Sequence, residues 1–297
     1  MSARPEARQV LSNPGSARVT RVAGLARRQA RERHGRFLAE GPQSVREAVR
    51  HAPDHVLDVY LTEAAAERYR EIVSQARQSG IHTHLVSPSV MEAMSADAQG
   101  ALAVVGVGAL AAPGRGRGAA EGSTTGASTD PAVGSVGDWA HALAGARLVA
   151  VLTEVQDPGN AGTIIRAADA AGADAVVLAR GSVEATSPKV VRSTAGSLFH
   201  LPVLTGGGLE EVVGALRAAG LTLLAADGRG PVDLFEADEL LAAPGAWLLG
   251  NEARGLAPAA LEQADAVVSI PIYGAAESLN VATAATICLY ASARAQR

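Results

Sequence analysis

The pattern of hydrophobic and polar positions predicts two blocks of alternating strands and helices. In the second block, continuous apolar runs predict buried strands at 148–152, 175–178, 221–225, 246–249 and 266–270. Helical spacing between or after them predicts helices at 160–171, 209–219 and 280–293. Continuous apolar strands joined by helical crossovers indicate a parallel sheet covered on both faces. Ligands of such sheets bind at the carboxyl ends of the strands.

The first block repeats this alternation on a smaller scale. A basic helix is expected at 18–34, and further helices are expected at 43–51, at 64–79 and directly after Ser87-Pro88. Strands are expected within 35–42 and at 56–61, 83–86 and 101–106. The block therefore predicts a small α/β domain.

Two segments lack any periodic apolar pattern. Residues 1–17 are predicted to be a flexible leader, and residues 109–145, rich in Gly, Ser and Thr, a flexible linker. A Gly-Arg-Gly-Arg-Gly stretch in the linker could touch RNA, although a plain spacer is favoured. The expected domains are therefore 18–108 and 146–297.

Composition excludes several classes of protein. The 297 residues contain no apolar run near the ~20 residues that span a bilayer, and the N-terminus lacks the apolar stretch of a signal peptide. Cys288 is the single cysteine, so an intrachain disulfide and a cysteine-rich metal site are excluded. The seven histidines are scattered, and we expect no metal and no membrane partner. A cytoplasmic location fits these features.

Charge is distributed unevenly along the chain. The net charge of −4 argues against nucleic-acid binding, yet residues 18–36 hold seven arginines against Glu32 alone, a local charge of +6. We expect Arg27, Arg28 and Arg31 to contact RNA phosphates. A solvated helix face is the alternative.

Three polar motifs each follow a predicted strand of the second block. They are Asp157-Pro-Gly-Asn-Ala-Gly-Thr-Ile-Ile-Arg166, Gly250-Asn-Glu-Ala-Arg-Gly255 and Ser278-Leu-Asn280. Taken singly, each has a plain structural alternative as a cap or a turn. Ser278 stands where the N-cap of the last helix is expected. The candidate catalytic residues are Asn160, Arg166, Glu252, Ser278 and Asn280.

In this order and spacing, the three motifs resemble those of the SpoU (TrmH) class of RNA ribose 2'-O-methyltransferases in the SPOUT superfamily. The resemblance covers roughly the last half of the chain, and Ala253 stands where the family often has glycine. Residues 37–48 resemble the L30e-like substrate-binding domain that precedes SpoU catalytic domains. The expected fold is thus an α/β SPOUT domain with a parallel sheet and a C-terminal trefoil knot, preceded by a small L30e-like α/β domain.

The resemblance also implies a cofactor, a partner and roles for particular residues. In the family the knot holds S-adenosylmethionine, and the corresponding positions here are Gly250, Ile270 and Leu279. The family builds its active site at a subunit interface, which implies a homodimer. Residues 187–202 also resemble the family: Lys189 and Arg192 could bind RNA phosphates, or their helix could pack the dimer.

The implied activity is methylation of a ribose 2'-hydroxyl, with 23S ribosomal RNA favoured as the substrate. The family's candidate base is the arginine of the first motif, here Arg166. Arginine is almost always protonated, so a phosphate with a water, or another group, could take the proton instead. The alternatives are a tRNA 2'-O-methyltransferase and a non-catalytic RNA-binding protein. A nucleotide-dependent oxidoreductase is disfavoured because the early glycine fingerprint is missing.

Overall fold

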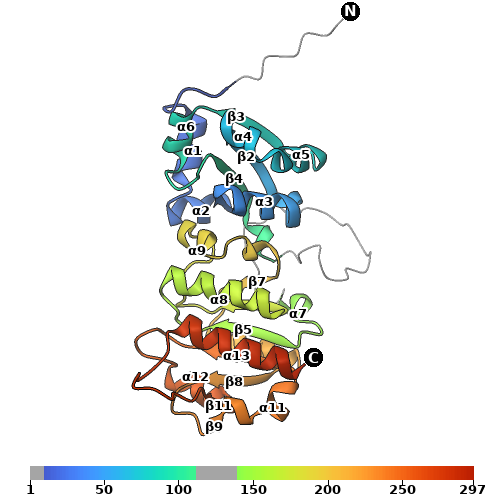
Figure 1. Cartoon of the computed structure of the whole chain (residues 1–297), viewed down its shortest axis with the longest axis vertical. Coiled ribbons are helices and arrows are strands. Elements are labelled where there is room, and N and C mark those ends of the chain that lie inside the picture. The colour runs from blue at the N-terminus through green and yellow to red at the C-terminus, as the bar shows by residue number, and fades with distance from the viewer. Residues whose placement is uncertain (1–9, 112–138) are drawn as a thin grey trace, which may run out of the picture. The chain divides into compact units, whose positions relative to one another are not determined.

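The structure is a computed structural model that describes residues 10–111 and 139–297. The chain divides into a smaller unit, residues 1–109, and a larger unit, residues 110–297 (Figure 1). Most of the expected linker lies outside the described residues, as do residues 1–9.

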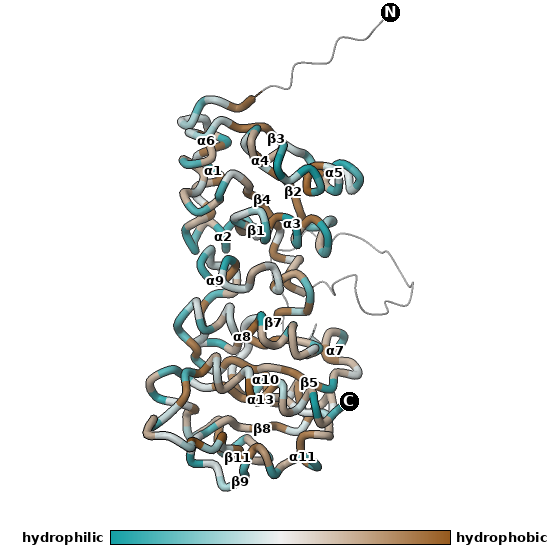
Figure 2. The backbone as a smooth tube through the Cα atoms, in the orientation of Figure 1, coloured by the Kyte–Doolittle hydropathy of each residue, from teal (hydrophilic) through white to brown (hydrophobic). Residues whose placement is uncertain are grey.

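The smaller unit is a four-stranded sheet with helices. Its helices are α1 (Ala17–Gly24), α2 (Arg28–His34), α3 (Gly41–His51), α4 (Glu63–Arg68), α5 (Arg70–Gln78) and α6 (Pro88–Met94). Its strands are β1 (Arg36–Glu40), β2 (Val56–Thr62), β3 (His82–Val86) and β4 (Ala101–Gly106), in the order β1-β4-β2-β3. Figure 2 shows hydrophilic residues concentrated on α2 and α5. The small α/β fold predicted for this part of the chain is confirmed.

The larger unit is built on a seven-stranded sheet. Its strands are β5 (Leu148–Leu152), β6 (Ala175–Leu178), β7 (Val203–Thr205), β8 (Thr222–Ala226), β9 (Val232–Asp233), β10 (Gly245–Leu249) and β11 (Ala266–Ser269). Their order is β7-β6-β5-β10-β8-β11-β9, and every strand pair is parallel. The predicted parallel sheet is confirmed, whereas the trefoil knot remains a prediction.

Helices cover both faces of this sheet. They are α7 (Trp139–Ala142), α8 (Pro158–Ala171), α9 (Pro188–Ser193), α10 (Leu209–Ala218), α11 (Asp238–Ala242), α12 (Pro258–Gln263) and α13 (Val281–Ala295). Side chains of α7, α10 and α12 share one core cluster with alternate residues of β5, β8 and β10. On the other face α13 lies beside α8 (Figure 1), and the buried Trp247 donates its indole N–H to Ser292 Oγ at 2.9 Å. The continuous apolar strands follow from this double burial.

Two expected helices are each interrupted. The basic helix is two helices, α1 and α2, separated at Leu25–Arg27. Gly24 ends α1, and glycine is a weak helix former. The helix expected at 64–79 breaks at Tyr69, whose φ of −114° and ψ of 54° are not helical. No glycine or proline marks this second break, so the periodic pattern could not reveal it.

The ends of the leader and linker belong to the folded units, contrary to the predicted boundaries. The backbone of Leu11 hydrogen-bonds Leu85 and Ser87 at 2.9 Å each, so residues 10–17 are not a free leader. In the expected linker, Trp139 and Leu143 are fully buried in the core of the larger unit. Two apolar residues in a short segment were too few to stand out as a core-forming pattern.

Candidate functional site

The three motifs lie at the carboxyl ends of strands β5, β10 and β11. Strand β10 pairs with β5 on one side and with β8 on the other, and β11 pairs with β8. Parallel strands bring their carboxyl ends to one edge of the sheet, and loops far apart in sequence meet there.

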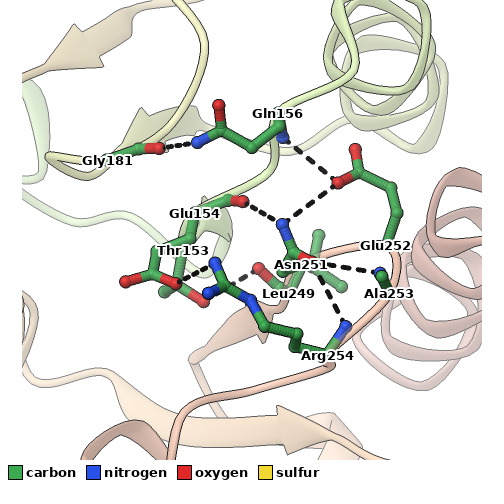
Figure 3. A network of polar contacts seen from close by, with 9 residues as sticks. All are labelled: Thr153, Glu154, Gln156, Gly181, Leu249, Asn251, Glu252, Ala253 and Arg254. Atoms are coloured by element: carbon green, nitrogen blue, oxygen red, sulfur yellow. Dashed lines mark hydrogen bonds and ion pairs between the residues drawn. The ribbon is translucent and has the colours of Figure 1, made fainter.

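Glu252 links the first two motifs. Its carboxylate accepts a hydrogen bond from the backbone N–H of Gln156 at 3.2 Å (Figure 3). It also accepts from the backbone N–H of Asp157 (2.9 Å) and from Asn160 Nδ2 (3.2 Å). The third motif joins through Asn280, whose Nδ2 donates to Asn160 Oδ1 at 3.0 Å. The structure therefore brings Asn160, Glu252 and Asn280 together in one hydrogen-bonded chain.

The Glu252 carboxylate is held in its charged form. Burial by itself would raise the pKa of Glu252, but the backbone N–H of Asp157 and the other donors outweigh burial. The pKa of Glu252 is therefore lowered from its ordinary value. A charged acceptor between two loops fixes the position of Asn160 more firmly than a neutral group would.

The loop that carries Glu252 is closed by its own contacts. Asn251 and Gly255 form an antiparallel bridge, and Asn251 Oδ1 accepts from the N–H groups of Ala253 and Arg254 (Figure 3). A Cβ on Gly250 would lie 2.3 Å from the carbonyl carbon of Gly255, so only glycine fits there. Ala253 has a negative φ, which explains why alanine is accepted where the family often has glycine.

A cavity of about 350 Å³ opens beside this loop. Gly250, Ile270 and Leu279, the three expected cofactor positions, all line it, together with Glu252 and Ser278. Its volume lies within the range of small-molecule sites, about 300–1,000 Å³.

The expected N-cap of the last helix is wrong. Asn280, not Ser278, is the N-cap of α13, and its Oδ1 accepts from the backbone N–H of Ala282 at 2.9 Å. Asp157 caps α8, and its Oδ1 accepts from the N–H of Asn160 at 2.8 Å. Serine, aspartate and asparagine cap equally well, so the residue type could not decide between neighbours. Ser278 is exposed and lies in the cavity wall instead.

Arg166 stands apart from the hydrogen-bonded chain. It is exposed on α8, six residues and about 9 Å of helix rise beyond Asn160. Among the described residues, no hydrogen bond or ion pair joins its guanidinium to Glu252, Ser278 or Asn280.

The expected RNA-contacting arginines differ in their surroundings. Arg31 is buried, and its Nη1 donates to the carbonyls of Leu25 (3.0 Å) and Ala26 (2.8 Å). Arg31 therefore satisfies the end of α1, and its expected phosphate contact stays a prediction that this burial disfavours. Arg27 is exposed, and Arg28 pairs with Glu32 at 2.7 Å, one helical turn away.

Lys189 and Arg192 both lie on α9, where Lys189 is exposed. This helix packs within the larger unit, because Ser193 Oγ donates to the carbonyl of Pro158 at 3.0 Å. Gly162 allows the close approach: a Cβ there would lie 1.9 Å from Ser193 Oγ.

Asp227, which the sequence motifs do not include, also lines the cavity. The carboxylate of Asp227 is mostly buried, and a hydrogen bond from the Arg229 guanidinium lowers the pKa of Asp227. Its position in the sequence could have identified it, because Asp227-Gly228 directly follows β8, at the same edge of the sheet as the three motifs. Glu277, another carboxylate of the cavity wall, was missed as well.

Within the described ranges, no helix combines the length and the apolar character that crossing a membrane requires.

Comparison with known proteins defines the class. The model of the SpoU rRNA Methylase family matches residues 147–290, and that of RNA 2'-O ribose methyltransferase substrate binding matches residues 38–106. The chain is 30% identical over 258 residues to the 23S rRNA (guanosine-2'-O-)-methyltransferase RlmB of Xanthomonas axonopodis pv. citri. That alignment covers 86% of this chain and 94% of the relative. The chain therefore belongs to the SpoU methyltransferase family.

Other relatives match different shares of the chain. The 23S rRNA (guanosine(2553)-2'-O)-methyltransferase RlmP of Bacillus subtilis is 45% identical over 150 residues, which is 50% of this chain and 58% of the relative. The chain thus spans little more than half of that relative. The structure of AviRb from Streptomyces viridochromogenes in complex with the cofactor AdoMet is 31% identical, with a TM-score of 0.71. That comparison covers 94% of this chain and 98% of AviRb.

Proposed function

We propose that this protein transfers a methyl group from S-adenosylmethionine to a ribose 2'-hydroxyl of 23S ribosomal RNA. The observation that carries the proposal is the hydrogen-bonded chain Glu252–Asn160–Asn280 at the edge of the cavity lined by Gly250, Ile270 and Leu279. The names of the relatives, which are 23S rRNA 2'-O-methyltransferases, support the choice of substrate.

The cavity fits the cofactor by its chemistry. Ile270, Ile272 and Leu279 offer apolar contacts for an adenosyl group. The carboxylate of Glu277 complements a positive charge, and so does that of Asp227, which Arg229 compensates in part. When bound, S-adenosylmethionine supplies an activated methyl group. AviRb and a rRNA methyltransferase of Sinorhizobium meliloti have both been solved with AdoMet.

The residues of this chain would act on the acceptor. A ribose 2'-hydroxyl is a weak nucleophile and must lose its proton during attack. We assign Asn160, Ser278 and Asn280 to positioning the ribose, and Glu252 to holding Asn160 in place. Correct placement of two reacting groups alone supplies a large part of the acceleration. Arg166 is assigned to the acceptor, where it stabilises charge or assists proton loss through a phosphate and a water.

The proposal also covers the role of the smaller unit and the oligomeric state of the protein. We propose that the smaller unit is the RNA substrate-binding domain, because the substrate-binding family model matches it.

We also propose a homodimer, in which the exposed Arg166 faces a site completed by the second copy. Light scattering at micromolar concentration tests this; a stable monomer would contradict it.

The activity is tested by mapping 2'-O-methyl groups in total RNA from cells with and without the protein. We expect one modified position of 23S rRNA to disappear. The purified protein should restore this position in unmodified rRNA when S-adenosylmethionine is added. Loss of a tRNA position instead would favour the tRNA alternative. A protein that binds RNA but never transfers a methyl group would favour the non-catalytic alternative.

A further inference from the structure

The smaller unit contains a basic cavity that the sequence motifs do not mark. Its volume is about 190 Å³, and its basic residues are Arg18, Arg21, His34 and Arg36. These four residues precede residues 38–106, the part of the chain that matches the substrate-binding family model. The basic residues of the cavity therefore lie outside the matched range, whereas Asp58, Tyr60 and Val104 of its wall lie within it.

The cavity is formed where α1 covers one face of the four-stranded sheet. Val22 and Leu25 of α1 pack in one core cluster with Tyr60 and Val104, and all four residues also line the cavity. Tyr60 of β2 and His84 of β3 are register partners, and their rings stack with centroids 4.9 Å apart. The polar residues thus surround a rigid apolar floor.

The positive charge in this cavity is only partly compensated. Asp58 is its one acidic residue, and this carboxylate is already bound by His84 Nε2 at 2.7 Å. Arg18 also contacts the His84 ring, with Nη1 3.1 Å from Nε2. Among the described residues, neither Arg21 nor Arg36 forms an ion pair with a carboxylate. Free guanidinium groups that converge on one hollow favour a phosphate ligand.

The basic lining continues toward the edge of the sheet. A second cavity, of about 780 Å³, shares Arg18 with the first and is also lined by Arg77, His82 and His84. Together the two cavities draw residues from β1, β4, β2 and β3. Four strands about 4.8 Å apart span about 14 Å, which is more than one phosphate group occupies. An extended polyanion matches this span better than a single small anion.

We propose that this groove, defined by Arg18, Arg21, His34, Arg36, Arg77 and His84, is the phosphate-binding track for the substrate RNA in the smaller unit. The inference rests on the proposed function for the identity of the RNA. It places the main phosphate contacts in the groove and not on the α2 arginines Arg27 and Arg28. Arg31 is excluded because its guanidinium binds backbone carbonyls.

Charge reversal in the full-length protein tests the proposal. The groove variant carries Arg21→Glu and Arg36→Glu. The matched control carries Arg33→Glu and Arg50→Glu, which change the net charge equally at two other exposed arginines of the same unit.

Affinity for an unmodified 23S rRNA transcript is measured over a range of salt concentrations. The groove variant should raise Kd at least tenfold and lower the salt slope by about 1.5, as the loss of two phosphate contacts requires. The control should change Kd less than threefold.

Two further double variants separate loss of phosphate contacts from misfolding and from binding through α2. Arg21→Gln with Arg36→Gln must weaken binding in the same direction, which guards against misfolding of the glutamate variant. Arg27→Glu with Arg28→Glu examines α2; if this variant or the control weakens binding as much as the groove variant, the proposal is wrong. Methyl transfer by the wild-type protein is measured separately. RNA that is bound through the groove but never methylated would contradict the proposed function alone.

Discussion

At the scale of single residues, Glu252 offers a test through pH. Its pKa is lowered in the folded protein, so its contribution to stability is present above its unfolded pKa of about 4.3. The contribution is lost as pH falls through the lower, folded value. Glu252→Gln should therefore destabilise the protein at pH 7 and much less at pH 3. Urea unfolding of both proteins at the two pH values measures this. If the two proteins differ in free energy of unfolding by the same amount at both pH values, the charge of Glu252 does not contribute to stability.

The role proposed for Arg166 is tested by two substitutions. Arg166→Ala should lower turnover at least a hundredfold while S-adenosylmethionine affinity, measured by calorimetry, stays within a few-fold. The cavity expected to hold the cofactor is lined by other residues, which is why binding should survive. Arg166→Lys should fail as well, since a compact ammonium does not replace a planar guanidinium. Near-normal turnover of the lysine variant would reduce Arg166 to a simple phosphate contact.

Cys288 should be chemically inert in the folded protein. It is fully buried in α13, and burial raises the pKa of its thiol to about 12. The reactive thiolate is therefore almost absent at pH 8. Iodoacetamide at pH 8 should label Cys288 only after denaturant unfolds the larger unit, as mass spectrometry would show. Rapid labelling without denaturant would contradict the burial of this helix.

At the scale of elements, the contact between α8 and α9 depends on Gly162. A Cβ at this position would meet both Ser193 Oγ and the Ser193 backbone, so Gly162→Ala must push the two helices apart. We expect a loss of about 1–3 kcal/mol in the free energy of unfolding. Gly214→Ala is the matched control, because a Cβ on Gly214 in α10 meets nothing within 4 Å. The control should be neutral or stabilise by up to about 1 kcal/mol. Equal effects of both substitutions on urea unfolding would contradict this account.

The elements also show where periodicity is informative. Strands β5, β6 and β10 are buried throughout, and their continuous apolar runs had no competing interpretation. Strands β7 and β9 are short and escaped notice. Gly24 marks the break of the basic helix, but Arg31, whose side chain stabilises the break, looks like one more surface arginine in the sequence.

At the scale of the whole molecule, the two units should separate in function. A variant without residues 1–108 should bind S-adenosylmethionine with nearly unchanged affinity, since the cavity lies within the larger unit. Its affinity for 23S rRNA should fall strongly, because the basic groove is removed. Calorimetry and RNA binding measure the two effects. Loss of cofactor binding in a variant that still unfolds cooperatively would show that the units depend on one another.

The sequence by itself determined the class of fold and the place of the site. Continuous apolar strands with helical crossovers require a doubly covered parallel sheet, and polar motifs after three of those strands must meet at one edge. The same reasoning singled out Asn160, Glu252 and Asn280, which the structure joins by hydrogen bonds.

Only the tertiary structure decided which chemical group each polar side chain meets. Asn280 rather than Ser278 caps α13, Arg31 binds carbonyls of its own unit, and Asp227 enters the cavity wall. Such choices depend on distances between segments that are remote in sequence. Local propensities treat Ser, Asn and Asp as equivalent caps, and every surface arginine as equivalent. Burial and hydrogen-bond geometry distinguish these residues from one another, and both arise only when the chain has folded.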